Sequence, residues 1–282
     1  MWMLQVLLYG VLKGSREIVK KKSLEKNSVM EVLFFYTLFA FLLVTPCAKS
    51  AMGVPLKFMG AIFLKSIIIF SAWILSFHAI KKMPISLYGV LDLSRVLFAT
   101  LLGCIVLREV MSIMQIIGLI LVSAGLLLLR FKRKTEEKQE SGVSTKIVLC
   151  ALLSCMLNAF SGLLDKVLMK DLNSSQLQFW YMLFLVLLYA VYLIVVHKKV
   201  EIKKAVSNPW IWMLAILFVI ADRSLFVANA DPNSKITIMT LIKQSGCLVT
   251  LAAGKWMYHD KNILHKAICT AIVVAGIVVA VL

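Results

Sequence analysis

Long apolar runs recur along this chain, and each is close to twenty residues in length. A helix of that length crosses about 30 Å of hydrocarbon. Of the 282 residues, 61% are hydrophobic and only 16% are charged, whereas soluble domains are nearer half apolar and a quarter charged. The sequence therefore predicts an all-α polytopic membrane protein. It excludes a soluble enzyme, a nucleic-acid module and a disulfide-stapled secreted domain.

Charged residues, Pro, Gly and Asn divide the apolar runs into ten predicted transmembrane helices. A charged stretch at 131–146, FKRKTEEKQESGVSTK, separates five helices within 1–130 from five within 147–282. We expect this stretch to be a solvated linker between two five-helix repeats. The predicted helices are 2–19, 30–47, 57–80, 85–106, 111–130, 147–169, 176–196, 209–229, 236–257 and 264–282.

Lys and Arg concentrate in the loops that follow the odd-numbered predicted helices, as in Lys20–Lys22 and Lys132–Lys134. The positive-inside rule predicts that such loops are cytoplasmic. We therefore expect a multi-pass protein of the cell membrane with both termini outside. The formal net charge of +17 then indicates contact with anionic lipid headgroups rather than with nucleic acid.

The two halves of the sequence follow a similar plan. At an offset of 151 residues Glu109 meets Asp260, and the helix ends SAGLLLL (Ser123–Leu129) and VAGIVVA (Val274–Ala280) are paired. Because each half has five helices, the second half enters the membrane from the opposite side. Inverted repeats of this kind are typical of transporters that bind a solute near the midplane and alternate its access.

An acidic residue after the fourth helix is followed by a Gly-containing fifth helix in LREVMSIMQIIGLILVSAG (Leu107–Gly125). With the five-plus-five plan, this segment resembles the drug/metabolite transporter superfamily, in particular its EamA-type members. The resemblance covers the whole chain and implies ten transmembrane helices in two inverted repeats, a transport function and no catalysis. Val110 and Met111 stand where the family commonly has a proline, and Asp260 stands where it usually has Glu.

Charged residues inside the predicted helices are the candidates for a functional site. Each would cost about 2.5 to 3.5 kcal/mol at a helix centre on insertion scales, so they must face one another or a cavity. The deep charges carry an excess of Lys and Arg, which favours an anionic solute because Arg and Lys bind carboxylate and phosphate. The candidate substrate-binding residues are Arg95, Lys243, Arg223, Asp92, Lys65, Lys13, Trp73 and Tyr88.

The roles of the acidic residues remain open at this point. Asp92 lies three residues before Arg95 and can pair with it along one helix face, either to lock the helix to a neighbour or to orient Arg95. Asp92 and Asp222 are candidates for proton transfer or gating. Asp222 and Arg223 differ by about 100° around their helix, and we expect Arg223 to be the one that faces the cavity.

Four further charges lie nearer the helix ends. Glu17, Asp165 and Lys166 are expected to be structural and to reach the membrane surface, and Arg16 is an intermediate case. A face of small residues at Gly118 and Gly125 indicates close helix packing, either within the chain or in a dimer.

These features together predict a secondary-active transporter of a small organic solute, anionic or zwitterionic, that works by alternating access through a central basic cavity. The chain has no G-x-x-x-x-G-K-[ST] motif for nucleotide binding, and we expect no cofactor, metal site or catalytic residue. Its partners would be the solute and the lipid bilayer, not nucleic acid, with the protein a monomer or a homodimer. A flippase for a lipid-linked anionic intermediate and an intramembrane enzyme are the alternatives.

Overall fold

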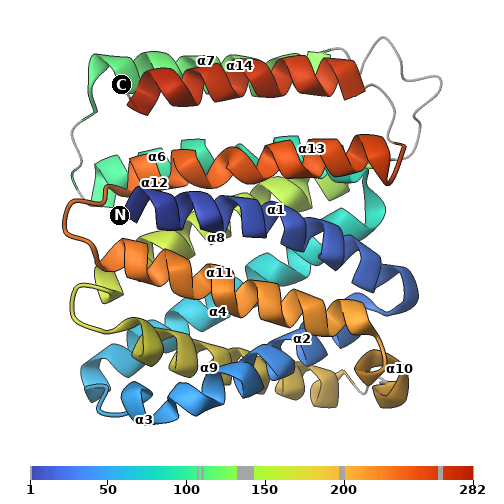
Figure 1. Cartoon of the computed structure of the whole chain (residues 1–282), viewed down its shortest axis with the longest axis vertical. Helices are drawn as coiled ribbons and strands as arrows, with labels where there is room; N and C mark the ends of the chain where they lie inside the picture. Colours follow the sequence, from blue (N-terminus) through green and yellow to red (C-terminus); the bar gives the residue numbers. More distant parts are fainter. Residues whose placement is uncertain are drawn as a thin grey trace.

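The computed structural model describes residues 2–106, 108, 111–131, 143–196, 201–259 and 263–281, and every regular element among them is a helix (Figure 1). The predicted all-α class is confirmed for this part of the chain. The helices in chain order are α1 Trp2–Lys26, α2 Val29–Val44, η1 Thr45–Cys47, α3 Ala48–Ala51, α4 Leu56–Lys82, α5 Ile85–Asp92, α6 Arg95–Val106, α7 Ile113–Phe131, α8 Thr145–Leu168, α9 Ser174–Val195, α10 Ile202–Val206, α11 Pro209–Ala230, α12 Ile236–Ile242, η3 Lys243–Ser245, α13 Gly246–Trp256 and α14 Ile263–Val281.

Among the described residues, six helical segments are long and apolar enough to cross a membrane, and they match the second, third, fourth, sixth, seventh and eighth predicted helices. Two shorter apolar helices, Ile113–Gly125 and Ile263–Gly276, match the fifth and tenth. The chain is therefore a multi-pass membrane protein. The six long segments are Val29–Ala51, Leu56–Lys82, Ile85–Val106, Thr145–Leu168, Ser174–Val195 and Pro209–Ala230.

Local sequence signals define where several of these helices begin. Ser28 caps α2 in a capping box with Glu31, whose side chain accepts from the Ser28 backbone N–H. Asn173 caps α9 in the same way with Gln176. Pro209 occupies the first turn of α11, where its missing N–H costs no helical hydrogen bond. These caps hold each helix end in a fixed position relative to the loops.

Helix α1 is longer than expected, because it runs to Lys26 rather than ending near residue 19. Its basic residues beyond position 19 do not stop the helix, and the first of them, Lys20, is buried against other side chains. The Lys20 ammonium lies 4.7 Å from the centre of the Phe77 ring and forms an ion pair with Glu17 at 2.7 Å. The ion pair of Glu17 and Lys20 is thus part of the protein interior.

Two predicted helices are interrupted near their middle. The predicted helix 85–106 consists of α5 and α6, and a turn at 93–94 separates them. The predicted helix 236–257 consists of α12, the short 3-10 turn η3 and α13. The first break begins after Asp92 and the second begins at Lys243, which are the two positions paired by the 151-residue offset.

Helix α1 crosses the second break at very short range. A Cβ atom on Gly14 would lie 2.5 Å from the Gly246 carbonyl oxygen, and one on Gly10 would collide with the Ser245 hydroxyl. Only glycine allows two backbones to approach so closely. This crossing holds the middle of α1, with Lys13, beside the break that carries Lys243.

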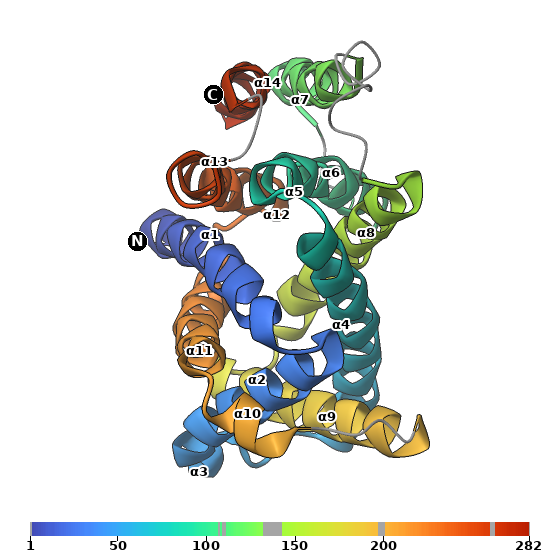
Figure 2. The ribbon, with the colours of Figure 1, turned by 90° about the vertical axis from the view of Figure 1, so that its right-hand side faces the viewer.

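At one end of the molecule α7 and α14 lie side by side, and α2 and α9 lie at the opposite end (Figures 1 and 2). A Cβ atom on Gly276 of α14 would be 2.7 Å from the Gly118 carbonyl oxygen of α7, and one on Gly125 would be 2.7 Å from the Val273 side chain. The small-residue face predicted from the sequence is therefore used for packing within the chain.

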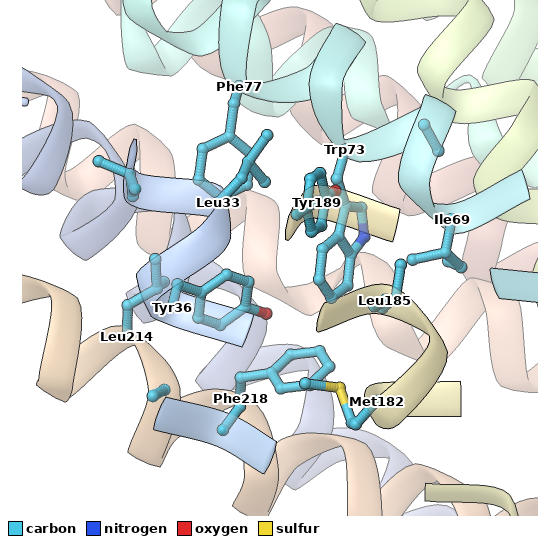
Figure 3. Close-up of a cluster of buried hydrophobic side chains, with 14 of the residues drawn as sticks. Leu33, Tyr36, Ile69, Trp73, Phe77, Met182, Leu185, Tyr189, Leu214 and Phe218 are labelled. Atoms are coloured by element: carbon cyan, nitrogen blue, oxygen red, sulfur yellow. The ribbon is translucent and has the colours of Figure 1, made fainter. Parts of the chain in front are cut away.

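The largest buried cluster is rich in aromatic side chains from α2, α4, α9 and α11 (Figure 3). The ring centres of Tyr36 and Trp73 are 5.3 Å apart, and Phe218 meets both in edge-on contacts. Trp73 and Phe218 also border the cavity described below. The core therefore fixes one wall of that cavity.

Some sequence expectations lie outside the described residues. They include the pairing of Glu109 with Asp260 and most of the linker expected at 131–146. The division of the chain into repeats at 1–130 and 147–282 stays a prediction.

Candidate functional site

A buried cavity of about 70 Å³ lies between α1, α4, α6, α8, α11 and η3. Charged and aromatic side chains from helices far apart in the sequence meet around it, although the surrounding helices are strongly apolar. Its charged lining consists of Lys13, Arg16, Glu17, Lys20, Lys65, Arg95, Asp165, Asp222 and Lys243. Its aromatic lining consists of Tyr9, Trp73, Tyr88, Tyr181 and Phe218.

Asp92 links α1 to the break between α5 and α6. The Lys13 ammonium donates to Asp92 Oδ2, and Arg95 Nη2 donates to Asp92 Oδ1 at 2.8 Å. The pair of Asp92 and Arg95 that their spacing suggested is therefore present. Asp92 itself stands behind the cavity lining, and Arg95 reaches the cavity with a buried Nε that has no acceptor among the described residues.

A second ion pair joins α4 to α8. Lys65 Nζ lies 3.0 Å from Asp165 Oδ1, and their side chains are 3% and 8% exposed. The same ammonium lies 3.9 Å from the centre of the Tyr181 ring, and the Tyr181 hydroxyl donates to Asp222. The expectation that Asp165 reaches the membrane surface is wrong, because its partner Lys65 holds it inside.

Arg16 and Glu17 also border the cavity rather than the membrane surface. Glu17 is paired with Lys20 on the next turn of α1. The Arg16 guanidinium lies 5.0 Å from the centre of the Phe218 ring, and its buried Nη1 has no hydrogen-bond partner among the described residues. Proximity to a helix end in the sequence was misleading here, because α1 extends well beyond its apolar run.

Arg223 lies outside the cavity, so the choice of Arg223 over Asp222 is wrong. Its guanidinium donates from Nη2 to Ser175 Oγ at 2.9 Å and lies 3.5 Å from Cys47 Sγ. Asp222 faces the cavity instead. The rotation of about 100° between neighbours in a helix separates the two side chains, and only packing decides which of them faces inward.

The remaining candidates divide between the cavity and the surface. Trp73 and Tyr88 line the cavity, and the Tyr88 hydroxyl lies 2.7 Å from Ser76 Oγ; their role in substrate binding stays a prediction. Lys166 is structural as expected, since it donates to the backbone carbonyls of Asn229 and Asp231 at the end of α11.

From the inward face of α1 the sequence analysis chose only Lys13 as a candidate for the site. Tyr9, Lys13, Arg16, Glu17 and Lys20 all line the cavity, and their spacings of three and four residues place them on one side of a helix. This periodicity is visible in the sequence once α1 is known to continue past residue 19. Asn158 and Tyr181 were also missed, and no charge marks them.

The cavity carries a net positive charge. With Asp92 included, six basic and four acidic side chains surround it, and each acidic side chain bonds a basic one or Tyr181. Arg16 and Lys243 have no ion-pair partner within the described part of the chain. Nor do the described residues hold a group of three or more His, Cys, Asp or Glu side chains suited to a metal ion.

Comparisons with known proteins agree with this architecture. A solved crystal structure with 14% sequence identity superposes with a TM-score of 0.70, covering 99% of this chain and 96% of that chain, which indicates a shared fold. No curated protein matches the sequence. The model of the EamA-like transporter family matches residues 1–131. Residues 1–131 of this membrane protein are therefore similar to the EamA-like transporter family, in agreement with their resemblance to EamA-type members.

Proposed function

We propose that this chain is a secondary-active transporter that moves a small organic anion or zwitterion across the cell membrane by alternating access. The observation that carries the proposal is a small, basic cavity bordered by two interrupted helices. The family match supports transport in general terms. The cavity supports the class of solute and the mechanism.

The two helix breaks support a two-half architecture. Discontinuous helices at equivalent positions of two repeats are the usual surroundings of a transporter's solute site. Here the break after Asp92 and the break at Lys243 are 151 residues apart and border one cavity through Arg95 and Lys243. They favour ten transmembrane helices, arranged as two inverted five-helix repeats over 1–130 and 147–282.

The size of the cavity supports alternating access rather than a channel. Pockets that bind small organic molecules usually have volumes of about 300 to 1,000 Å³, whereas this cavity has about 70 Å³. A solute of more than a few atoms can therefore enter only when helices move apart. Ion pairs between α1 and α5 and between α4 and α8 are contacts that such a movement would rearrange.

The charges support an anionic solute and an orientation. A buried cation without a counterion is costly, and an anion that binds beside Arg16 and Lys243 offsets that cost. The basic loops after odd-numbered helices favour a cytoplasmic location for those loops. Since no nucleotide-binding motif accompanies the cavity, an ion gradient or solute exchange would drive transport.

The proposal is tested on the purified protein in two steps. A melting-temperature screen against carboxylated, phosphorylated and cationic metabolites identifies ligands, because a ligand that binds the folded protein raises its apparent stability. Counterflow of the best ligand in proteoliposomes then measures transport. We expect anions to stabilise the protein and to exchange across the bilayer, and Lys243→Gln to abolish both effects.

Arg223→Gln is the matched control, because it removes a half-buried guanidinium outside the cavity and should retain ligand binding and counterflow. Stabilisation by cations or neutral compounds alone would refute the solute class. A ligand-independent conductance without counterflow would refute alternating access.

A further inference from the structure

Three cationic side chains around the cavity have N–H groups without a hydrogen-bond or ion-pair partner among the described residues. Arg16 Nη1 on α1 and Arg95 Nε on α6 are buried and make no hydrogen bond among the described residues. Lys243 on η3 is 8% exposed, and within the described part of the chain it forms no ion pair. All three residues line the same cavity.

The four carboxylates of the cavity are already engaged. Asp92 is shared between Lys13 and Arg95, and Glu17 is bound by Lys20. Asp165 is bound by Lys65, and Asp222 accepts from the Tyr181 hydroxyl. Six basic side chains against these four leave two positive charges that the described residues do not neutralise.

We propose that the solute of this transporter is a small dianion, either a dicarboxylate or a phosphate monoester. This inference rests on the proposed transport function and specifies its substrate class. A dianion neutralises both excess charges, whereas a monoanion leaves one of them buried and a zwitterion leaves both. Buried charge without a counterion carries a large desolvation cost, so the neutral combination is favoured.

The number and origin of the donors support the same class. Arg16, Arg95 and Lys243 come from three separate elements, so their donors approach a shared ligand from different directions. A monocarboxylate offers only two oxygens, both at one end. A dicarboxylate offers four oxygens at two ends, and a phosphate monoester offers three terminal oxygens around one centre, which suits Arg and Lys together.

The experiment compares four probes on the purified full-length protein by the shift in melting temperature at constant ionic strength and pH 7.5. Succinate and butyrate have the same number of carbon atoms and differ by one carboxylate, methyl phosphate supplies the phosphate dianion, and choline supplies a cation. We expect succinate or methyl phosphate to bind at least about tenfold more tightly than butyrate, since one charge-assisted contact contributes about that much.

The variants Arg16→Gln and Lys243→Gln should each weaken binding of the dianion about tenfold or more. They should also reduce the difference in affinity between the dianion and butyrate. Two control variants should leave these affinities unchanged. Arg223→Gln changes a guanidinium outside the cavity, and Lys204→Gln changes an exposed ammonium paired with Glu201. If Arg16→Gln does not fold, Arg16→Lys is the substitute, because it keeps the charge but removes the planar guanidinium. It should weaken binding of the dianion by a smaller factor.

Each outcome bears on the inference. Binding of succinate alone supports a dicarboxylate, and binding of methyl phosphate alone supports a phosphate monoester. Equal affinities for succinate and butyrate would overturn the dianion class but leave an anion transporter in place. Binding of choline alone would overturn both this inference and the proposed solute class. An absence of any shift with both dianions would also overturn the inference.

Discussion

The ion pair between Lys65 and Asp165 makes the strongest test of how the cavity is held together. Replacing Lys65 by Met keeps an apolar stem of similar length and leaves the Asp165 carboxylate buried without its partner at 3.0 Å. Breaking a buried pair from one side costs about 3 to 5 kcal/mol. Loss of the contact between the Lys65 ammonium and the Tyr181 ring at 3.9 Å adds about 1 kcal/mol.

The double variant separates the pair from its surroundings. Lys65→Met combined with Asp165→Leu removes both charges, and a buried pair replaced by apolar side chains is often neutral or even stabilising. We therefore expect the double variant to be more stable than Lys65→Met alone, with an interaction energy of about 3 kcal/mol in a double-mutant cycle. At roughly 2 to 4 °C per kcal/mol, these costs predict that Lys65→Met lowers the melting temperature by roughly 8 to 24 °C.

The assay is thermal unfolding of the detergent-purified variants, followed by tryptophan fluorescence. The matched control is the cycle on Lys204 and Glu201, an exposed pair at 3.2 Å whose side chains are 50% and 67% exposed. Such surface pairs contribute less than about 1 kcal/mol. If Lys65→Met lowers the melting temperature no more than Lys204→Met, or if the costs in the buried cycle simply add, the pair does not join α4 to α8 as we describe.

Three further changes probe the helix contacts by the same melting assay. Gly14→Leu should destabilise the fold by more than about 3 kcal/mol, because the new side chain would force α1 away from the break beside it. Gly60→Leu is the control, because a Cβ atom at that position has no neighbour within 4 Å, and it should have little effect. Equal effects of the two substitutions would contradict the close crossing. Ser28→Ala removes the cap of α2 and should cost about 0.5 to 2 kcal/mol, with Ser28→Asn as a rescue. Ser154→Ala removes a hydrogen bond of 2.9 Å to the Ala72 carbonyl. It should cost about 0.5 to 1.5 kcal/mol, which is the range for such bonds between membrane helices. A larger loss of stability would indicate that the substitution leaves a packing defect between α4 and α8.

Much of the fold could be predicted from the sequence, because the length and spacing of apolar runs depend on bilayer thickness alone. Most predicted boundaries are within a few residues of the observed ones. The interruptions at 93–94 and at Lys243–Ser245 could not be predicted in this way, because the apolar pattern continues through both breaks. The end of α1 was also mistaken, since lysines buried by ion pairs and aromatic rings look the same in a sequence as lysines in a loop.

The site could be predicted only in part, for a reason that Asp222 and Arg223 illustrate. The cost of burying charge indicates that such residues face a common interior, and Lys13, Lys65, Arg95 and Lys243 do line one cavity. Which of two adjacent charges turns inward depends on the neighbouring helices. Arg223 finds Ser175 on α9, and no pattern within α11 reveals that contact.

The pairing of charges within the cavity distinguishes the cations that already have a partner from those that do not. Each carboxylate holds a cation or hydroxyl from a different turn or a different helix: Asp92 holds Lys13, Asp165 holds Lys65 and Asp222 holds Tyr181. Under the proposed function, these contacts engage the acidic groups and leave Arg16 and Lys243 as the charges for a solute to neutralise. Lys243 lies in a helix break, and Arg16 lies on α1, which crosses that break at Gly14 and Gly246. A movement of α1 relative to α12 and α13 would therefore change the distance between these two cations. Binding of an anion and the opening of the cavity would then be coupled through one helix crossing.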